Sequence, residues 1–218
     1  MWSPPTGGTG GGERTPTAPH GPTRRSWTAP ERCGRVVPLA RRLAARGFTV
    51  LVPDLPGNAR SRAVVRRMPD VVRTADVLAR WHRRLVPGPS LLVANSVGCQ
   101  VAAALTYRHP SLSHRLVMLG PALTPGASAW RQAGRLLADA PREQLSLIGL
   151  AAADYLLTLV VRGAGDTIAS EAWTRRITQL IADGRAIEVP DAAHAAHYSK
   201  PEAVAKLIEA CAAAGEHR

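Results

Sequence analysis

A serine stands where a predicted strand runs directly into a predicted helix. The run Leu91-Leu-Val-Ala94 is continuously apolar, Ser96 follows it, and Gly98 comes two residues later. A sharp turn at this junction would lift the serine hydroxyl out of the sheet and place it at a helix N-terminus, where the backbone N–H of Val97 can meet a developing oxyanion. This arrangement is typical of a nucleophilic serine. The junction alone fits equally well with Ser96 acting only as the cap of the helix.

Two later loops carry the partners that a nucleophilic serine needs. A histidine must remove the proton of the serine, and an acid must orient that histidine. Asp166 follows a predicted strand at 156–161, and His194 follows one at 185–189. The chain order of serine, acid and histidine, each on a loop after a strand, favours a Ser96–His194–Asp166 constellation. The alternatives are that Asp166 caps the next helix and that His194 is an ordinary loop histidine.

Other residues are weaker candidates for chemistry. Asp54 ends a strand, but it lies upstream of the serine. His197 could join His194 on a metal ion, yet no third ligand has suitable spacing. Cys99, on the first turn of the helix after Ser96, is expected to be a small buried residue rather than a second nucleophile. We therefore expect neither a metal nor a cofactor.

Alternating helical and strand-like segments must position these residues. Apolar residues recur at helical spacing between short apolar runs that Gly or Pro closes. Short, continuously apolar strands that alternate with helices predict an α/β fold, with a mostly parallel sheet of about five strands and helices on both faces. The predicted strands are 48–52, 91–94, 115–119, 156–161 and 185–189.

Two further segments complete the predicted organisation. Residues 1–35 are rich in Pro, Gly, Thr and Arg, and they are expected to be disordered, so that the folded domain spans 36–218. Residues 124–155 have helical spacing without a strand. They are predicted to form a short helical lid over the carboxyl ends of the strands, where open α/β sheets bind ligands, although one or two plain surface helices would fit the same pattern.

Composition narrows the classes of function. The chain has 218 residues, 45% of them hydrophobic, and a formal net charge of +12. All 28 of its basic residues except Lys200 and Lys206 are arginines, and they are scattered along the chain, so we expect a solvated surface rather than a nucleic-acid or polyanion interface. No apolar run is long enough to span a membrane, and no secretory signal is recognised. The three cysteines are widely spaced. A cytoplasmic protein with reduced thiols is expected.

These motifs together resemble the α/β-hydrolase superfamily, in particular its lid-bearing esterases and carbon–carbon bond hydrolases. The resemblance covers residues 36–214. It implies Ser96 as nucleophile, Asp166 as acid, His194 as base and the Val97 N–H as one oxyanion donor. The matching stretches are Ala44 to Gly57, Leu91 to Gln100, Arg108-His-Pro110 with Leu116 to Pro121, Val161-Arg-Gly-Ala-Gly-Asp166 and Val189-Pro-Asp-Ala-Ala-His194.

Three departures from the family pattern are visible. Ala94 stands where the elbow motif has glycine. The lid segment passes almost directly into the strand at 156–161, so the lid is expected to be shortened. The family also has a strand ending in a His-Gly loop, which supplies a second oxyanion donor; the only His-Gly pair here, His20-Gly21, does not follow an apolar run. No equivalent strand is expected, which would leave the strand at 48–52 unpaired and favour self-association.

The resemblance implies a serine hydrolase that acts on an ester, or on a related acyl or carbon–carbon bond, of a small apolar substrate. The competing interpretation is an impaired or inactive remnant of such an enzyme, which keeps Ser96, Asp166 and His194 without a complete oxyanion hole. A polyanion-binding protein is the third hypothesis, and its binding would have to weaken with salt.

Overall fold

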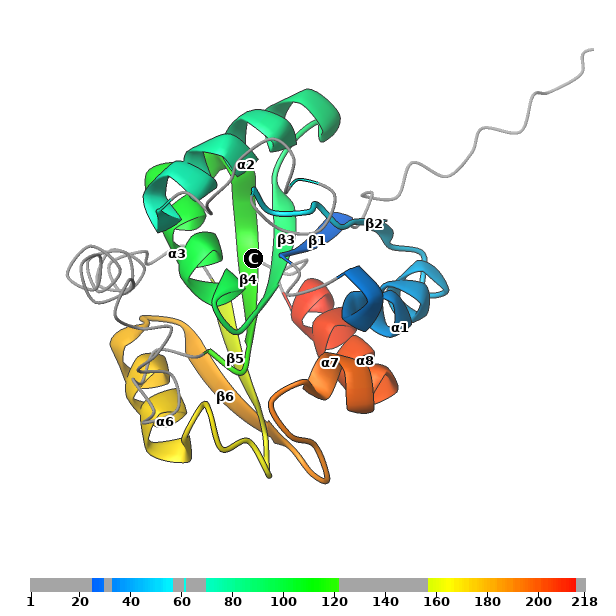
Figure 1. The fold of residues 1–218 in the computed structure, drawn as a ribbon, viewed down its shortest axis with the longest axis vertical. Coiled ribbons are helices and arrows are strands. Elements are labelled where there is room, and N and C mark those ends of the chain that lie inside the picture. Colours follow the sequence, from blue (N-terminus) through cyan, green and yellow to red (C-terminus); the bar gives the residue numbers. More distant parts are fainter. Residues whose placement is uncertain (1–24, 30–32, 57–60, 62–69, 122–156, 215–218) are drawn as a thin grey trace, which may run out of the picture.

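Six parallel strands form the centre of the structure, a computed structural model that describes residues 25–29, 33–56, 61, 70–121 and 157–214 (Figure 1). The sheet order is β2-β1-β3-β4-β5-β6. The predicted α/β fold with a parallel sheet is confirmed, and each of the five predicted strands is present with slightly different ends. The strands are β1 Arg25–Ala29, β2 Thr49–Leu51, β3 Ser90–Asn95, β4 Ser113–Leu119, β5 Leu157–Gly163 and β6 Gly184–Val189.

The strand β1 was not expected, and it corrects the sequence analysis. Its residues fall in the stretch 1–35 that was predicted to be disordered, yet they pair with β2 on one side and β3 on the other. The helix α1 also begins inside that stretch, at Cys33. The prediction is therefore wrong for these residues, whereas 1–24 and 30–32 lie outside the described residues. The sequence Arg-Ser-Trp-Thr-Ala lacks a continuous apolar run, and its strand pairing depends on two distant segments.

Pairing with β1 also changes the expectation for the strand predicted at 48–52. This strand, β2, is hydrogen-bonded to β1 along one side, with Thr49 opposite Arg25 and Leu51 opposite Trp27. Within the described ranges its other side is an outer edge of the sheet. The expectation that no strand covers it is thus wrong for one side, and self-association remains a prediction.

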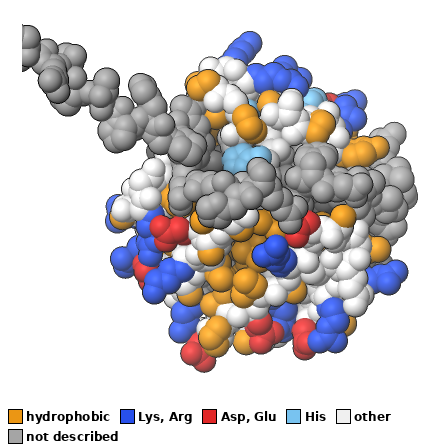
Figure 2. All heavy atoms as spheres, turned by 180° about the vertical axis from the view of Figure 1, so that it is seen from behind, with side chains coloured by type: hydrophobic (Ala, Val, Ile, Leu, Met, Phe, Trp, Pro, Cys, Tyr) orange, Lys and Arg blue, Asp and Glu red, His pale blue; other side chains and the backbone are white. Residues whose placement is uncertain are grey.

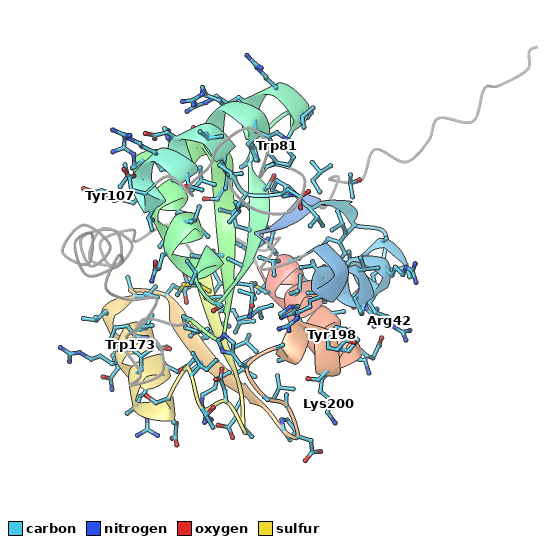
Figure 3. The ribbon with its side chains drawn as sticks, in the orientation of Figure 1. Arg42, Trp81, Tyr107, Trp173, Tyr198 and Lys200 are labelled. Carbon is cyan, nitrogen blue, oxygen red and sulfur yellow. The ribbon has the colours of Figure 1, made fainter. Side chains whose placement is uncertain are left out.

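Helices cover both faces of the sheet, as predicted. The helices α1, α7 and α8 pack on one face, and α2, α3 and α6 pack on the other (Figure 1). Figure 3 shows Arg42 on α1 close to α8, where its Nε lies 3.7 Å from a carboxylate oxygen of Glu202. The helices are α1 Cys33–Ala44, α2 Val71–Leu85, α3 Gly98–Arg108, α6 Glu171–Leu180, α7 Ala196–Ser199 and α8 Pro201–Ala213, with a short 3₁₀ turn, η2, at Pro110–Leu112.

The central strands bury both of their faces, which explains their continuous apolar runs. All six residues of β3 are buried. Successive side chains point to opposite faces, so Leu91 and Val93 join the core beneath α1 and α8, whereas Leu92 and Ala94 join the core beneath α2 and α3. The two helix layers therefore hold β3 from both sides, and Ser96 follows this strand directly.

Polar side chains set the starts of two helices. Asp70 accepts a hydrogen bond from the backbone N–H of Arg73 at the start of α2, and Ser170 accepts one from Trp173 at the start of α6. Such caps satisfy backbone donors that have no partner within the helix. The predicted alternative that Asp166 caps α6 is wrong, because Ser170 holds that position.

The helical lid predicted at 124–155 lies outside the described residues. None of the described helices is both long and apolar enough to cross a membrane.

Figure 2 shows the basic side chains dispersed over the visible face with acidic side chains among them, which agrees with the scattered arginines of the sequence.

Candidate active site

The strand order places the candidate nucleophile at a reversal of the sheet. From β1 the chain moves outward to β2 through α1, and it then returns to the other side of β1 to form β3. In open parallel sheets, ligands bind at the carboxyl ends of the strands beside such a reversal. Ser96 directly follows β3 at that position.

The backbone at Ser96 has the shape of a sharp elbow. Its φ angle is +53°, in the left-handed region that a serine adopts only at a cost of about 1–3 kcal/mol. Val97 has already returned to helical angles, and α3 begins at Gly98. The Ser96 N–H donates to the carbonyl of Leu119 at the end of β4 at 3.0 Å, which anchors the turn. The structure thus has the sharp strand-to-helix turn that the sequence predicts, and the backbone of this turn is strained at Ser96.

The three predicted site residues lie together. His194 Nε2 is 2.9 Å from Ser96 Oγ, and His194 Nδ1 is 2.9 Å from Asp166 Oδ2. Both distances are those of normal hydrogen bonds. Ser96 is 5% exposed, and the Asp166 side chain is fully buried, whereas that of His194 is 16% exposed. The imidazole therefore links a buried carboxylate to the serine hydroxyl, in an order that suits proton removal from Ser96.

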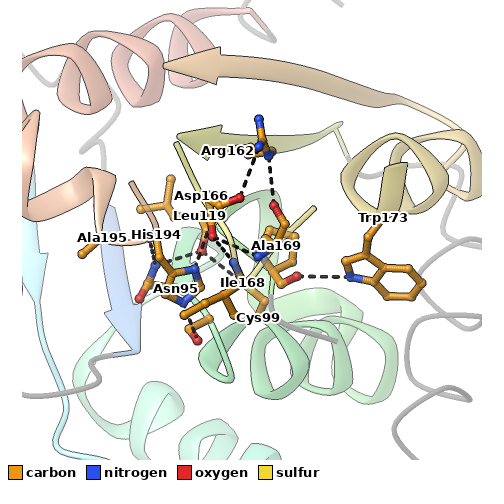
Figure 4. Close-up of polar contacts among 12 residues, drawn as sticks. Asn95, Cys99, Leu119, Arg162, Asp166, Ile168, Ala169, Trp173, His194 and Ala195 are labelled. Atoms are coloured by element: carbon orange, nitrogen blue, oxygen red, sulfur yellow. Dashed lines mark hydrogen bonds and ion pairs between the residues drawn. The ribbon is translucent and has the colours of Figure 1, made fainter. Parts of the chain in front are cut away.

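Asp166 is held by its own loop (Figure 4). Its Oδ1 accepts hydrogen bonds from the N–H groups of Ile168 at 2.8 Å and Ala169 at 2.9 Å. These bonds leave Oδ2 to face His194. A buried carboxylate is costly unless its oxygens have hydrogen-bond partners, and here both of them do. The loop therefore fixes the direction of the carboxylate toward the imidazole.

Two residues at strand ends support the site, Gly120 directly after β4 and Asn95 at the end of β3. Gly120 has a φ of +53°, and a Cβ added there would lie 3.0 Å from both Asp166 Oδ2 and His194 Nδ1. Asn95, which is 5% exposed, donates through Nδ2 to the carbonyls of Leu119 at 2.9 Å and His194 at 3.5 Å. Sequence reasoning missed the role of Gly120, which it took only as a strand end. The signal was a glycine at the carboxyl end of a strand neighbouring the elbow.

The weaker candidates lie elsewhere or are buried. Asp54 follows β2, and β1 separates that strand from β3. His197, on α7, is buried and lines a small cavity of about 10 Å³ with Asn95 and apolar neighbours. In the described part of the chain, no three His, Cys, Asp or Glu side chains are grouped to hold a metal ion. Cys99 is buried, as predicted, with Sγ 3.4 Å from the carbonyl of Ala94.

One of the two expected oxyanion donors, the Val97 N–H, lies in the described part of the chain. Val97 stands at the start of α3, and within the described ranges its N–H donates to no assigned acceptor. The strand β1 occupies the place beside β3 from which a second donor was thought to be missing. Residues 30–32, which follow β1, lie outside the described residues. The competing hypothesis of an impaired remnant assumed that no strand lies beside β3 at this position. Because β1 is present there, that argument for the hypothesis no longer applies.

Comparison with known proteins identifies a family for the chain. A family model described as serine aminopeptidase, S33, matches residues 29–150, which is more than half of the chain. The match begins in β1 and includes Ser96. A comparison with curated proteins gave no significant match.

Solved structures share the fold at low sequence identity. A predicted CIB-like hydrolase from Thermoplasma acidophilum has a TM-score of 0.68 at 15% identity, covering 89% of this chain and 88% of its own. The meta-cleavage product hydrolase CumD from Pseudomonas fluorescens IP01 has a TM-score of 0.65 at 14% identity, covering 86% and 89%. A thermophilic esterase from Thermogutta terrifontis has a TM-score of 0.64 at 18% identity, covering 86% and 88%. By its family match and its fold, the chain belongs to the serine aminopeptidase S33 family of α/β hydrolases.

Proposed function

We propose that this α/β hydrolase is a serine hydrolase that cleaves an ester, or a related acyl or carbon–carbon bond, of a small apolar substrate. The observation that carries the proposal is the continuous hydrogen-bonded path from Ser96 Oγ through the His194 ring to Asp166 Oδ2, with both distances at 2.9 Å. A serine hydroxyl becomes an effective nucleophile when an oriented imidazole can accept its proton.

The first chemical step follows from this geometry. With its proton on Nδ1, His194 donates to Asp166 and offers the lone pair of Nε2 to the Ser96 hydroxyl. Ser96 Oγ then forms a bond to the carbonyl carbon of the substrate, and its proton moves to Nε2. Asp166 stabilises the imidazolium that results. The Val97 N–H, at the start of α3, is proposed to donate to the oxyanion.

The second half of the reaction uses the same groups. The imidazolium gives its proton to the leaving group as the bond between that group and the carbonyl carbon breaks, which leaves an acyl group on Ser96. A water molecule loses a proton to His194 Nε2 and attacks the acyl carbon, and the serine takes a proton back as the product leaves. No metal or cofactor takes part in this proposed sequence.

The relatives support the reaction class more than any one substrate. The family is described by an aminopeptidase activity, and the similar structures include an esterase and a meta-cleavage product hydrolase. These reactions share nucleophilic attack at a carbonyl carbon, which the proposed site is arranged to perform. Ester cleavage is therefore the reaction that a general substrate can test first.

Labelling with a fluorophosphonate probe tests the proposal. The reagent should modify Ser96 in the wild-type protein, and Ser96→Ala should abolish the labelling, as read by mass spectrometry of the modified peptide. The chain offers a matched control, because Ser90 at the other end of β3 is also buried and lies 2.8 Å from a histidine, His82, without an acid in that pair. Ser90→Ala should leave labelling unchanged. Modification of Cys99, or labelling that survives Ser96→Ala, would refute the assignment.

A further inference from the structure

A cationic side chain, that of Arg162, is hydrogen-bonded to the backbone of the loop that carries the candidate acid. Arg162 is on β5, four residues before Asp166, and its side chain is 13% exposed. Its Nε donates to the carbonyl of Ala169 at 2.9 Å. Its Nη2 donates to the carbonyls of Ala164 at 3.1 Å and Asp166 at 3.2 Å. One guanidinium group thus holds three backbone carbonyls of a single loop, and Figure 4 shows the contacts to Asp166 and Ala169.

The opposite side of the same loop faces the carboxylate. The N–H groups of Ile168 and Ala169 point to Asp166 Oδ1, while the carbonyls of Asp166 and Ala169 point to Arg162. The loop backbone therefore lies between a fixed cation and a fixed anion. A planar guanidinium presents its donors in a rigid fork, so it can set the spacing of several carbonyls at once.

The fourth contact of Arg162 links the two loops of the site. Its Nη1 pairs with Glu188, which stands directly opposite it on β6. Each of these residues shortly precedes a site loop, because Asp166 follows β5 and His194 follows β6. A backbone hydrogen bond joins the same loops, from the N–H of Gly165 to the carbonyl of Ala192. The Arg162–Glu188 pair is therefore placed to fix the acid loop relative to the histidine loop.

We infer that Arg162 is a positioning residue for the proposed reaction, which aligns the Asp166 carboxylate with His194 by holding the backbone of the acid loop. The inference rests on the proposed function. The contacts of Arg162 are to the loop backbone and to Glu188 rather than to Ser96, so it acts through the placement of the acid loop. Removing its guanidinium releases three carbonyls, and a small displacement of Asp166 lowers the rate of proton transfer more than it changes substrate affinity.

Three variants and one control test this inference. Arg162→Gln removes the fork, Arg162→Lys keeps the charge without the planar fork, and Glu188→Gln removes the ion pair but keeps the carbonyl contacts. The control is Arg46→Gln. Arg46 has a similar exposure of 18%, pairs with Glu202 and Glu209, and donates to a backbone carbonyl, but it joins α1 to α8 away from the loops.

Steady-state hydrolysis of a p-nitrophenyl ester separates kcat from KM. We expect Arg162→Gln to lower kcat by about 10- to 100-fold with KM unchanged, Arg162→Lys to lower it less, and Glu188→Gln to lower it least. Arg46→Gln should lose thermal stability without losing kcat. If Arg162→Gln does not fold, Arg162→Lys decides the matter: a lower kcat at unchanged KM supports positioning, and a wild-type kcat overturns it.

A spectroscopic readout separates this inference from the proposed function. The proton that His194 Nδ1 shares with Asp166 should give a downfield NMR resonance, which Asp166→Ala would identify by removing it. We expect the resonance to shift or broaden in Arg162→Gln and to stay unchanged in Arg46→Gln. An unchanged resonance in Arg162→Gln would overturn the inference. A wild-type protein that keeps the resonance, but whose Ser96 resists the probe, would overturn the proposed function alone.

Discussion

Asp166 illustrates how much of the proposed chemistry depends on one buried group. Its two carboxylate oxygens accept three hydrogen bonds, two from backbone N–H groups and one from His194. The residue as a whole is 3% exposed and its side chain is fully buried, so the carboxylate has little access to water. These partners explain how a carboxylate can remain in this position, and they also leave it only one direction in which to face the imidazole.

Replacement of Asp166 by Asn should separate its role from that of Asp54. The amide can keep the backbone contacts through its oxygen, but its NH₂ group would face a donor on His194 Nδ1 and favour the wrong tautomer. We expect kcat/KM for ester hydrolysis to fall by about 10⁴-fold in a folded protein. Asp54→Asn, after the edge strand β2, should change kcat/KM little. Equal large losses in two well-folded variants would show that the acid is misassigned.

Gly120 should be required for the alignment of Asp166 and His194. Gly120→Ala would place a Cβ 3.0 Å from Asp166 Oδ2 and His194 Nδ1, and these atoms would have to move. Gly88→Ala is the matched control, since its φ is also positive, at +95°, with nothing within 4 Å of the added Cβ. Both variants should lose about 1–2 kcal/mol of stability from the left-handed backbone. Only Gly120→Ala should also lower kcat, by about 10-fold or more; similar kcat values for the two would contradict this role.

At the scale of elements, β1 is the strand that the sequence pattern did not predict. Its backbone pairs on both sides, with Thr28 opposite Val93 of β3 and Trp27 opposite Leu51 of β2. Backbone amides of 26–29 should therefore exchange slowly with deuterium. Thr28→Pro should cost about 3 kcal/mol or more, because proline removes a ladder donor in a central strand, whereas Arg25→Pro at the start of β1 should be tolerated. Exchange at the rate of an unstructured peptide would contradict the strand.

The contact between α2 and β3 predicts a pH dependence of stability. His82 is 1% exposed, and burial lowers its pKa from the ordinary value. The neutral ring pairs with Ser90 Oγ at 2.8 Å. Because the unfolded chain binds the proton more readily, the contribution to stability is present above the unfolded pKa and is lost as the pH falls from about 6.5 toward the lower folded value.

Unfolding in urea at pH 7.5 and at pH 5.5 measures this contribution. We expect the free energy of unfolding of the wild type to be lower at pH 5.5. His82→Gln should be less stable at the higher pH, but it should lose less on acidification. A variant that loses as much stability as the wild type over this interval would show that His82 is not the group responsible.

For the whole molecule, local apolar patterns predicted the buried strands and the helices that cover them, but they did not predict which distant segments pair with one another. The apolar runs of β3 to β5 gave the central strands, since strands buried on both faces need apolar residues throughout. Ser96 and Asp166 could be predicted because each follows such a run, and His194 could be predicted because its loop follows the next strand along the chain, β6. The sequence of β1 contains too few apolar residues to give the same signal, and its pairing with 49–51 and 91–94 is a property of the folded sheet.

The supporting contacts of the site could not be predicted for a related reason. Gly120 matters because two side chains from other loops approach within 3.0 Å of its missing Cβ. Arg162 matters because its loop folds back over its guanidinium group. Gly120 carries only the signal of a glycine after a strand, and Arg162 carries none, because their neighbours are brought close only by the parallel packing of β4, β5 and β6.

The central claim is that Ser96, His194 and Asp166, on three loops at one edge of the sheet, act as one unit. A cycle of single, double and triple alanine variants, measured as kcat/KM for a p-nitrophenyl ester, tests it most directly. Residues that work in one proton path are strongly non-additive. We predict that His194→Ala lowers kcat/KM by about 10⁴-fold or more in the wild-type protein and has no further effect once Ser96→Ala is present. A further loss in that background, or independent losses that add across the three positions, would contradict the account.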